Sequence, residues 1–93
     1  MDFEWDEDKR WINFNQHGID FEDAELMFDG RDVVTDKSPY ADEERYITVG
    51  MIDDRFMTIV WTRRGTATRI ISARRSRDSE KRKHRSLYGG GAS

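Results

Sequence analysis

The sequence contains no cysteine, a single proline and only two histidines among its 93 residues. Without cysteine there is no disulfide framework and no thiolate metal site, which fits a reducing compartment. No apolar run approaches the roughly 20 residues that a helix needs to cross a bilayer. The first ten residues are acidic and amphipathic, unlike a signal peptide. We therefore expect a soluble, cytoplasmic protein with no membrane partner.

Patterns that hold metals or phosphates are also scarce. The two histidines, His17 and His84, lie far apart in the chain, and neither HxH nor HExxH occurs. Acidic runs such as residues 6–8 and 42–44 are typical of solvated loops and helix starts. The glycines of the final GGGAS neither follow a strand nor begin a helix, so they do not form a phosphate loop. We expect no metal and no cofactor.

The charge is distributed very unevenly along the chain. Residues 1–54 carry 17 acidic and five basic residues, a balance of −12, whereas residues 55–93 carry two acidic and eleven basic residues, a balance of +9. Such asymmetry indicates a surface for a polyanion or a charged partner, unless the two halves neutralise each other within the fold. A pI near 5.3 argues against indiscriminate coating of nucleic acid.

Two helices are predicted in the acidic half. Asp6 is a suitable N-cap for a helix over residues 7–17, and Gly18 suits the left-handed position that ends it. Asp20 is the N-cap of a second helix over about residues 21–29. The apolar stripe of this second helix, which is typical of core packing, consists of Phe21, Ala24, Met27 and Phe28.

After the second helix the apolar residues recur with a period of two, as in strands. Short strands are predicted at residues 3–6 and 32–35, with a polar loop at 36–44. Longer strands are predicted at residues 45–52, 55–64 and 68–75, joined by short turns into an antiparallel meander.

A very polar helix beginning near Asp78 follows the last strand. The predicted fold is α+β, with an antiparallel sheet of about four to five strands. Two N-terminal helices pack on one face of this sheet, and a C-terminal helix completes the domain. We expect a single domain over residues 1–88 and a flexible glycine-rich tail over 89–93.

Basic side chains gather on the last two long strands. They are Arg63, Arg64, Arg69, Arg74 and Arg75. Guanidinium groups match phosphate geometry in a bidentate way and remain charged at any physiological pH. Trp61 and Tyr46 would add stacking surface for single-stranded nucleic acid. For any one arginine, an ion pair with Glu43, Glu44 or a helix carboxylate is at least as good an explanation.

Cleavage of RNA without a metal requires little from a protein, because the 2′-hydroxyl is the internal nucleophile. The protein supplies a base, an acid and cations for the developing phosphorane charge. The side chains available for proton transfer are His17, His84, Lys9 and Glu80. His17 also fits an ordinary helix end, and His84 also fits a solvated helix surface.

Strand alternation complicates the arginine cluster. In a regular strand over residues 68–75, Arg69 and Arg74 point to opposite faces of the sheet. Either a β-bulge re-aims one of them, or only one contacts RNA and the other is structural. We expect Arg74 to be the contact.

Several short motifs, taken in order, resemble the BrnT family of type II toxins, which has a RelE-like ribonuclease fold. The motifs begin with FEWDEDK at residues 3–9 and continue through Asn13, the His17-Gly18 pair, Ile19, Phe21, Ala24 and Phe28. They include Glu44-Arg45 and Gly50, and are strongest at Arg64-Gly65, RIISAR at 69–74 and Glu80. The resemblance covers about residues 2–85.

The resemblance implies an endoribonuclease toxin that inhibits translation by cleaving RNA. It also implies neutralisation by a BrnA-like antitoxin with a ribbon-helix-helix DNA-binding domain. A toxin–antitoxin heterotetramer, involvement of the ribosome and binding of operator DNA only through the antitoxin belong to the same expectation. The alternative function is a non-catalytic interaction module whose basic C-terminal strand and helix bind an acidic protein partner.

Six residues match the family pattern by position: Lys9, His17, Arg64, Arg69, Arg74 and Glu80. The predicted catalytic residues are Arg64, Arg74, His17, Lys9 and Glu80. The predicted RNA-binding residues are Arg63, Arg69, Arg75, Trp61 and His84.

The sequence also departs from the family pattern. Gln16 stands where the family usually has lysine, Trp61 and Arg63 replace residues that are more often His or Tyr and Glu, and His84 replaces a common tyrosine. These departures leave the arginine set intact and leave the acid/base assignment open.

Overall fold

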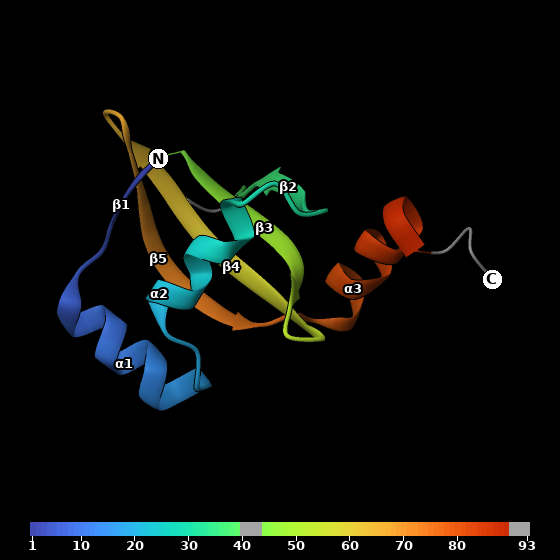
Figure 1. Cartoon of the computed structure of the whole chain (residues 1–93), viewed down its shortest axis with the longest axis horizontal. Helices are drawn as coiled ribbons and strands as arrows, with labels where there is room; N and C mark the ends of the chain where they lie inside the picture. The colour runs from blue at the N-terminus through green and yellow to red at the C-terminus, as the bar shows by residue number, and fades with distance from the viewer. Residues whose placement is uncertain (40–43, 90–93) are drawn as a thin grey trace.

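The computed structural model describes residues 1–39 and 44–89. Residues 40–43 of the predicted loop at 36–44 and residues 90–93 of the predicted tail at 89–93 lie outside these ranges. Within them the fold is α+β, as predicted (Figure 1). Its elements are β1 (Asp2–Glu4), α1 (Glu7–His17), α2 (Phe21–Ala24), β2 (Val34–Lys37), β3 (Arg45–Ile52), β4 (Arg55–Arg64), β5 (Ala67–Arg75) and α3 (Asp78–His84). A 3₁₀ turn (Glu25–Phe28) continues α2, and a π turn (Arg85–Gly89) continues α3.

The strands form one sheet in the order β1-β5-β4-β3-β2. The predicted meander of β3, β4 and β5 is confirmed, and β2 pairs antiparallel with β3. The prediction of a wholly antiparallel sheet is wrong at one edge, where β1 pairs parallel with β5 from Asp2–Ala67 to Glu4–Arg69. No hairpin joins these two strands, so no tight turn imposes an antiparallel direction on the pair.

Local signals set the boundaries of α1 and of the β3–β4 turn. The Asp6 carboxylate accepts hydrogen bonds from the backbone N–H groups of Asp8 and Lys9, and Gly18 ends the helix in the left-handed region at φ 71°. Asp53 and Asp54 both have positive φ, 51° and 63°. This is the two-residue hairpin geometry in which both central residues are left-handed, and it confirms the predicted tight turn.

The second helix is shorter than predicted. Regular α-helix stops at Ala24, and the chain continues as a 3₁₀ turn that places Met27 directly over the sheet. A Cβ atom at Gly50 would lie 2.6 Å from the Met27 sulfur and 2.9 Å from a Val33 methyl carbon. A side chain at this position of β3 would therefore force the Met27 and Val33 side chains to move from their places against the sheet.

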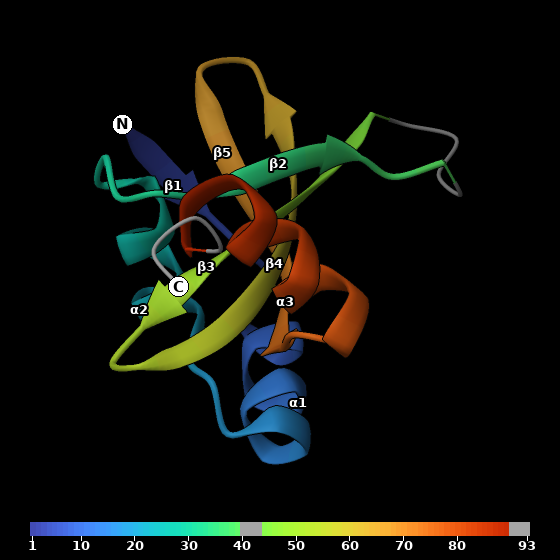
Figure 2. The same cartoon turned by 90° about the vertical axis from the view of Figure 1, so that its right-hand side faces the viewer.

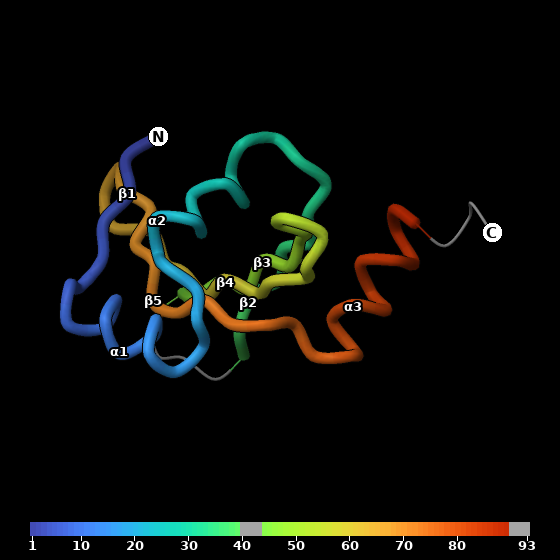
Figure 3. Tube along the Cα trace, turned by 60° about the horizontal axis from the view of Figure 1, so that its bottom comes forward, coloured from blue at the N-terminus to red at the C-terminus, as the bar shows by residue number. Residues whose placement is uncertain are grey.

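One face of the sheet packs against α2 and its 3₁₀ extension. Phe21, Met27, Ile59 and Ile70 are at most 2% exposed on this face, which holds the hydrophobic core. The first helix does not match the prediction of two helices packed on one face, because its only buried residue is Asn13. Figures 1 and 3 show α1 and α3 near opposite ends of the molecule, whose longest extent is 42 Å.

Asn13 attaches α1 to the open edge of β5. Its side-chain amide donates to the Ala73 carbonyl at 2.9 Å, and its side-chain oxygen accepts from the Ala73 N–H at 3.1 Å. The same amide nitrogen donates to the Ile19 carbonyl at 3.1 Å, which also fixes the chain between α1 and α2. Asn13 thus occupies the hydrogen-bonding position that another strand would take beside β5.

The C-terminal helix begins at Asp78 as predicted and contacts the sheet face opposite the core (Figure 2). The Lys83 ammonium contacts Asp36 of β2 at 2.6 Å, and the His84 ring nitrogen lies 2.9 Å from the Asp32 carbonyl oxygen. No helix in the described ranges is long and apolar enough to cross a membrane.

Replacing Asn13 by alanine leaves the N–H and C=O of Ala73 without partners at a buried edge. Because each unpaired buried group is costly, we expect Asn13→Ala to lower the free energy of unfolding by about 2–4 kcal/mol. Urea unfolding followed by circular dichroism measures the change. Asn15→Ala, at an exposed position of the same helix, is the matched control and should change stability by less than about 0.5 kcal/mol. Equal effects of the two substitutions would contradict the role given to Asn13.

Candidate functional site

The last strand contains one residue more than the strand it pairs with. Val60 pairs with Ser72, whereas the next residue of β4, Trp61, pairs with Ile70. Ile71 therefore has no partner in β4, and β5 bulges at this position. The sequence left open whether a bulge re-aims an arginine, and the register shows that it does.

The bulge brings three arginines onto one face of the sheet. Residues paired across two strands point to the same side of the sheet. Arg69 pairs with Thr62 and Arg74 with Thr58, and these two threonines point to the same side of β4 as Arg64. We call this group of Arg64, Arg69 and Arg74 the arginine face, and it lies opposite the core. Without the extra residue, Arg69 and Arg74 would point to opposite sides.

The other predicted RNA-binding arginines lie on the core side of the sheet. Arg63 pairs with Thr68 and Arg75 with Met57, in register with the core residue Ile59. Both arginines are exposed. The structure therefore does not bring Arg63 and Arg75 together with the arginine face.

Two of the rings predicted to contact RNA, Trp61 and His84, are buried. Trp61 is 8% exposed, donates from its indole nitrogen to the Thr48 hydroxyl at 2.8 Å, and stacks on Tyr46 with 4.7 Å between ring centroids. His84 is also 8% exposed and contacts the rings of Phe56 and Tyr88. Their positions are explained by packing, and neither ring belongs to the arginine face.

The members of the arginine face are spread along the strands. Arg64 follows Thr58, the partner of Arg74, by six residues, so about 20 Å of strand separates the two ends. Arg69 lies between them. One phosphate group cannot contact both Arg64 and Arg74, whereas a chain of several nucleotides can.

Arg74 is held in place by a carboxylate from α3. Its two terminal nitrogens bond the two carboxylate oxygens of Glu80 at 2.8 and 2.9 Å, and Nη1 also donates to the Arg75 carbonyl. Glu80 further accepts from the Arg77 N–H and from the Thr58 hydroxyl, which in turn contacts the Ser76 hydroxyl at 2.7 Å. The side chains of Arg74 and Glu80 are 19% and 17% exposed, so the pair is rigid but still accessible.

These contacts leave one edge of the Arg74 guanidinium open. Its Nε–H and the second N–H of Nη2 have no partner within the described part of the chain. Elsewhere in the protein this same Nε/Nη2 edge binds a carboxylate, in Arg10 with Asp20 and in Arg31 with Asp29. Arg74 thus presents an unoccupied two-donor edge, which suits two oxygens of a phosphate.

The surroundings of Glu80 keep it ionised. Burial alone would raise the pKa of Glu80, but the hydrogen bonds from Arg74, the Arg77 N–H and Thr58 outweigh burial and lower it. A carboxylate that is ionised and accepts all these bonds is poorly suited to donating a proton. Glu80 is better suited to orienting Arg74.

Arg69 is held less firmly than Arg74. Its closest carboxylate oxygen belongs to Glu4 in β1 and lies 3.7 Å away, beyond hydrogen-bonding distance. That oxygen is buried and has no hydrogen-bond partner in the described residues. Of the partners expected from the sequence, Glu43 lies outside the described residues, Glu44 pairs with Lys37, and the ion pair of Arg69 is with Glu4.

The two proton-transfer candidates of α1 lie on the side of the helix that faces β5. Lys9 and His17 are four residues before and after Asn13, so the three residues form one row along α1. Asn13 is bonded to Ala73, the residue directly before Arg74. Lys9 is exposed and His17 is half-buried. Lys9 and His17 therefore share the row of α1 that carries the anchor to β5, but neither forms a hydrogen bond or ion pair with Arg74 in the described residues.

Three residues that organise this region escaped the sequence analysis as candidates. Asn13 positions α1, and Thr58 and Ser76 support Glu80. A polar residue inside a strongly apolar strand, such as Thr58 in RFMTIVW, is a usable signal that its face meets polar groups. Asn13 gives no such signal by its polarity, because an asparagine in a helix is more often exposed than paired with a strand edge, and only its place in the family motifs singled it out.

Among residues 1–39 and 44–89, no group of three or more His, Asp or Glu side chains is close enough to hold a metal ion. The polar centre of the region is the ion pair of Arg74 and Glu80, together with Thr58 and Ser76.

Replacing Glu80 by glutamine removes the charge that holds Arg74. At pH 7 we expect Glu80→Gln to lower the free energy of unfolding by about 1–3 kcal/mol, since hydrogen bonds to charged groups are being weakened. The pKa of Glu80 is lowered in the folded protein, so its charge stabilises the fold above the ordinary carboxyl pKa of about 4.3. This contribution is lost as the pH falls below that value, and the difference between wild type and variant should shrink. Urea unfolding at pH 7 and pH 3 measures both values.

Asp78→Asn provides the matched control for this experiment, because the Asp78 side chain lies in the same helix and is 87% exposed. A Glu80→Gln difference that is the same at both pH values would contradict the ionised state assigned to Glu80.

The chain matches the family described as "Ribonuclease toxin, BrnT, of type II toxin-antitoxin system" over residues 5–80, which include Lys9, the arginine face and Glu80. No individual curated protein matches the chain closely enough to count as a relative. Because the match extends over most of the chain, the protein belongs to the BrnT family of ribonuclease toxins from type II toxin–antitoxin systems.

Proposed function

We propose that this toxin is a metal-independent endoribonuclease that inhibits translation by cleaving RNA bound along the arginine face. The observation that carries this proposal is the unoccupied Nε/Nη2 edge of Arg74, held rigid by Glu80 on the same face as Arg64 and Arg69. The proposal includes a RelE-like fold, a single domain over residues 1–88 and a cytoplasmic location.

Arg74 is assigned to the scissile phosphate. Attack of the 2′-hydroxyl on the adjacent phosphorus builds negative charge on the non-bridging oxygens of the phosphorane. A guanidinium that is already oriented stabilises this charge without reorganising during the reaction, and Glu80 provides the orientation. Glu80 is therefore a positioning residue in this proposal, and not the proton donor.

Proton transfer is assigned to α1. The reaction requires a base that removes the 2′-hydroxyl proton and an acid that protonates the leaving 5′-oxygen. Lys9 and His17 lie in the row that Asn13 anchors beside Ala73, which supports them for these two roles.

Arg64 and Arg69 are assigned to phosphates that flank the cleavage site. The strand length of about 20 Å between the ends of the arginine face fits several nucleotides. Arg63 and Arg75 lie on the other side of the sheet, and Trp61 and His84 are buried. These four residues are therefore left out of the proposed RNA contact.

We further propose a BrnA-like antitoxin with a ribbon-helix-helix domain as the partner, in a heterotetramer that binds operator DNA only through the antitoxin. The family places the toxin in a type II system, in which the antitoxin is a protein. The ribosome is a further proposed partner, and comparing RNA cleavage with and without ribosomes tests it.

Cleavage of total RNA by purified toxin in EDTA tests the arginine face. We expect Arg74→Ala to reduce the rate about 100-fold, the size of effect seen when one donor to a developing oxyanion is removed. Arg74→Lys should recover less than a tenth of the cleavage rate that Arg74→Ala loses, because lysine lacks the two-donor edge. Arg63→Ala removes an exposed arginine that is the neighbour of Arg64 but lies on the opposite side of the sheet, and it should leave the rate within threefold.

Equal rates for Arg74→Ala and Arg63→Ala, with both proteins folded, would refute the assignment of the arginine face. Intact RNA after incubation with wild-type toxin would instead favour the non-catalytic interaction module.

Single-turnover cleavage by Lys9→Ala and His17→Ala tests the roles given to α1. Removal of a general acid or base typically costs 10²- to 10⁴-fold in rate, so we expect at least one variant to fall in this range. Gln16→Ala, from the same turn as His17 and exposed, is the control and should retain its rate. If both variants cleave within threefold of wild type, the protons are handled by groups outside α1.

A further inference from the structure

A second surface lies on the flank of α1 that turns away from β5. The side chains of Trp11 and Phe14 are one helical turn apart and are 63% and 45% exposed. Together with Arg10 and Asp20 they line a cavity of about 210 Å³, which we call the aromatic groove. A single exposed apolar side chain is ordinary, but two aromatic rings beside a cavity form a surface that a partner can bury.

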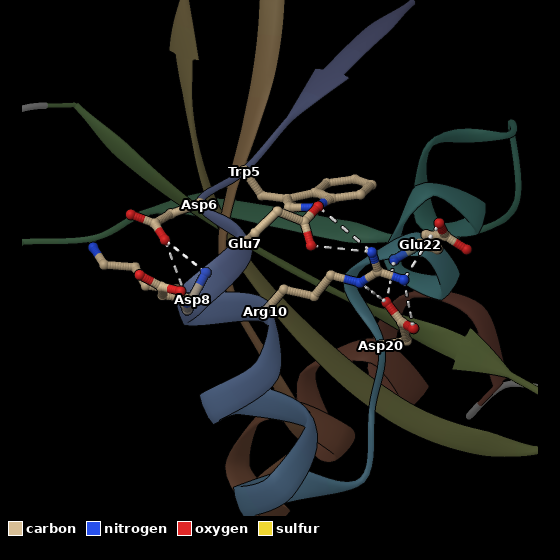
Figure 4. Close-up of polar contacts among 8 residues, drawn as sticks. Trp5, Asp6, Glu7, Asp8, Arg10, Asp20 and Glu22 are labelled. Atoms are coloured by element: carbon tan, nitrogen blue, oxygen red, sulfur yellow. Dashed lines mark hydrogen bonds and ion pairs between the residues drawn. The ribbon is translucent and has the colours of Figure 1, made fainter.

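One wall of the aromatic groove is rigid. The Nε/Nη2 edge of Arg10 bonds the carboxylate of Asp20 at 2.8 and 3.0 Å, and the Arg10 guanidinium also lies 3.3 Å from both Glu7 and Glu22 (Figure 4). The hydrogen bond from Arg10 lowers the pKa of Asp20, so the pair remains charged. The guanidinium also lies 5.8 Å from the centre of the Trp5 ring. The cavity is thus formed before any partner binds.

The charge of this wall selects the kind of partner. Three carboxylates surround one guanidinium, so the group carries a net charge of −2. The side chains of Glu7 and Glu22 are 64% and 63% exposed and can each accept a further cation. Such a rim repels the phosphates of RNA and attracts a segment that combines lysine or arginine with an apolar side chain.

We propose that the aromatic groove docks a basic amphipathic segment of the antitoxin. The partner rests on the toxin–antitoxin function, whereas the docking site rests on the exposed rings, the cavity and the acidic rim. One apolar side chain of the segment fills the cavity against Trp11 and Phe14, and its cations pair with Glu7 and Glu22. The antitoxin then holds the toxin at the α1 flank bordering α2, a surface separate from Arg64, Arg69 and Arg74.

Isothermal titration of full-length toxin with the antitoxin encoded in the same operon tests the proposal. We expect the double variant Trp11→Ala/Phe14→Ala to bind at least tenfold more weakly than wild type. Ile12→Ala is a closely matched control, since Ile12 is the neighbour of Trp11 and is also 63% exposed, but projects from a different flank of α1. Its affinity should stay within twofold. Thermal unfolding should be unchanged in both proteins, because none of these side chains is buried.

The acidic rim gives a second measurement. Glu22→Gln should weaken antitoxin binding about three- to tenfold at low salt, and the difference from wild type should shrink at high salt. Wild-type affinity in the double variant would overturn the proposal. So would a toxin dimer, seen by light scattering, that the double variant abolishes, because the groove would then hold a second copy of the toxin.

RNA cleavage by the free double variant separates this inference from the proposed function. We expect its rate to match that of wild type, since the groove lies apart from the arginine face. If wild-type toxin leaves RNA intact while the double variant still loses antitoxin affinity, the ribonuclease proposal fails and the docking site stands.

Discussion

The register shift at Ile71 allows β5 to contribute residues to the core on one face and both Arg69 and Arg74 to the other face, which a regular strand could not do. Upstream of the bulge, Ile70 enters the core while Arg69 points outwards, and downstream Ala73 enters the core while Arg74 points outwards. The five-residue interval between the two arginines is odd, so only an unpaired residue puts both on one face. The core, the arginine face and the Ala73 backbone that receives Asn13 all depend on this one position.

The arginine face is also linked to α3 through a single carboxylate. Glu80 connects Arg74 of β5, the first turn of α3 and the buried hydroxyl of Thr58. Arg74 therefore takes its orientation from a helix that begins only after the sheet is complete. The phosphate-binding edge and the packing of the C-terminal helix are parts of the same hydrogen-bond network.

Local signals in the sequence were enough to predict most elements, but not how they meet. Asp6 and Gly18 mark the ends of α1, and alternation marks β3, β4 and β5. The parallel pairing of β1 and the end of α2 at Ala24 depend on tertiary contacts, such as Met27 over Gly50, that no local pattern contains. Strand alternation predicted that Arg69 and Arg74 point to opposite faces unless a bulge intervenes. Only the pairing of β4 with β5 shows that the bulge is present. For Trp61 the local pattern was misleading. Its position between strand arginines predicted an exposed ring that stacks on RNA, but the ring is buried in the core.

The two hydrogen bonds between Asn13 and Ala73 join a side chain to a backbone. Substitutions at the two positions therefore have different effects on these bonds. Almost any substitution at position 13 removes both hydrogen bonds at once. At position 73 the N–H and C=O belong to the peptide chain, and only proline would remove the donor. The placement of Lys9 and His17 is thus sensitive to substitution at the single position 13. The backbone groups of β5 that receive the helix are retained by almost any residue at position 73.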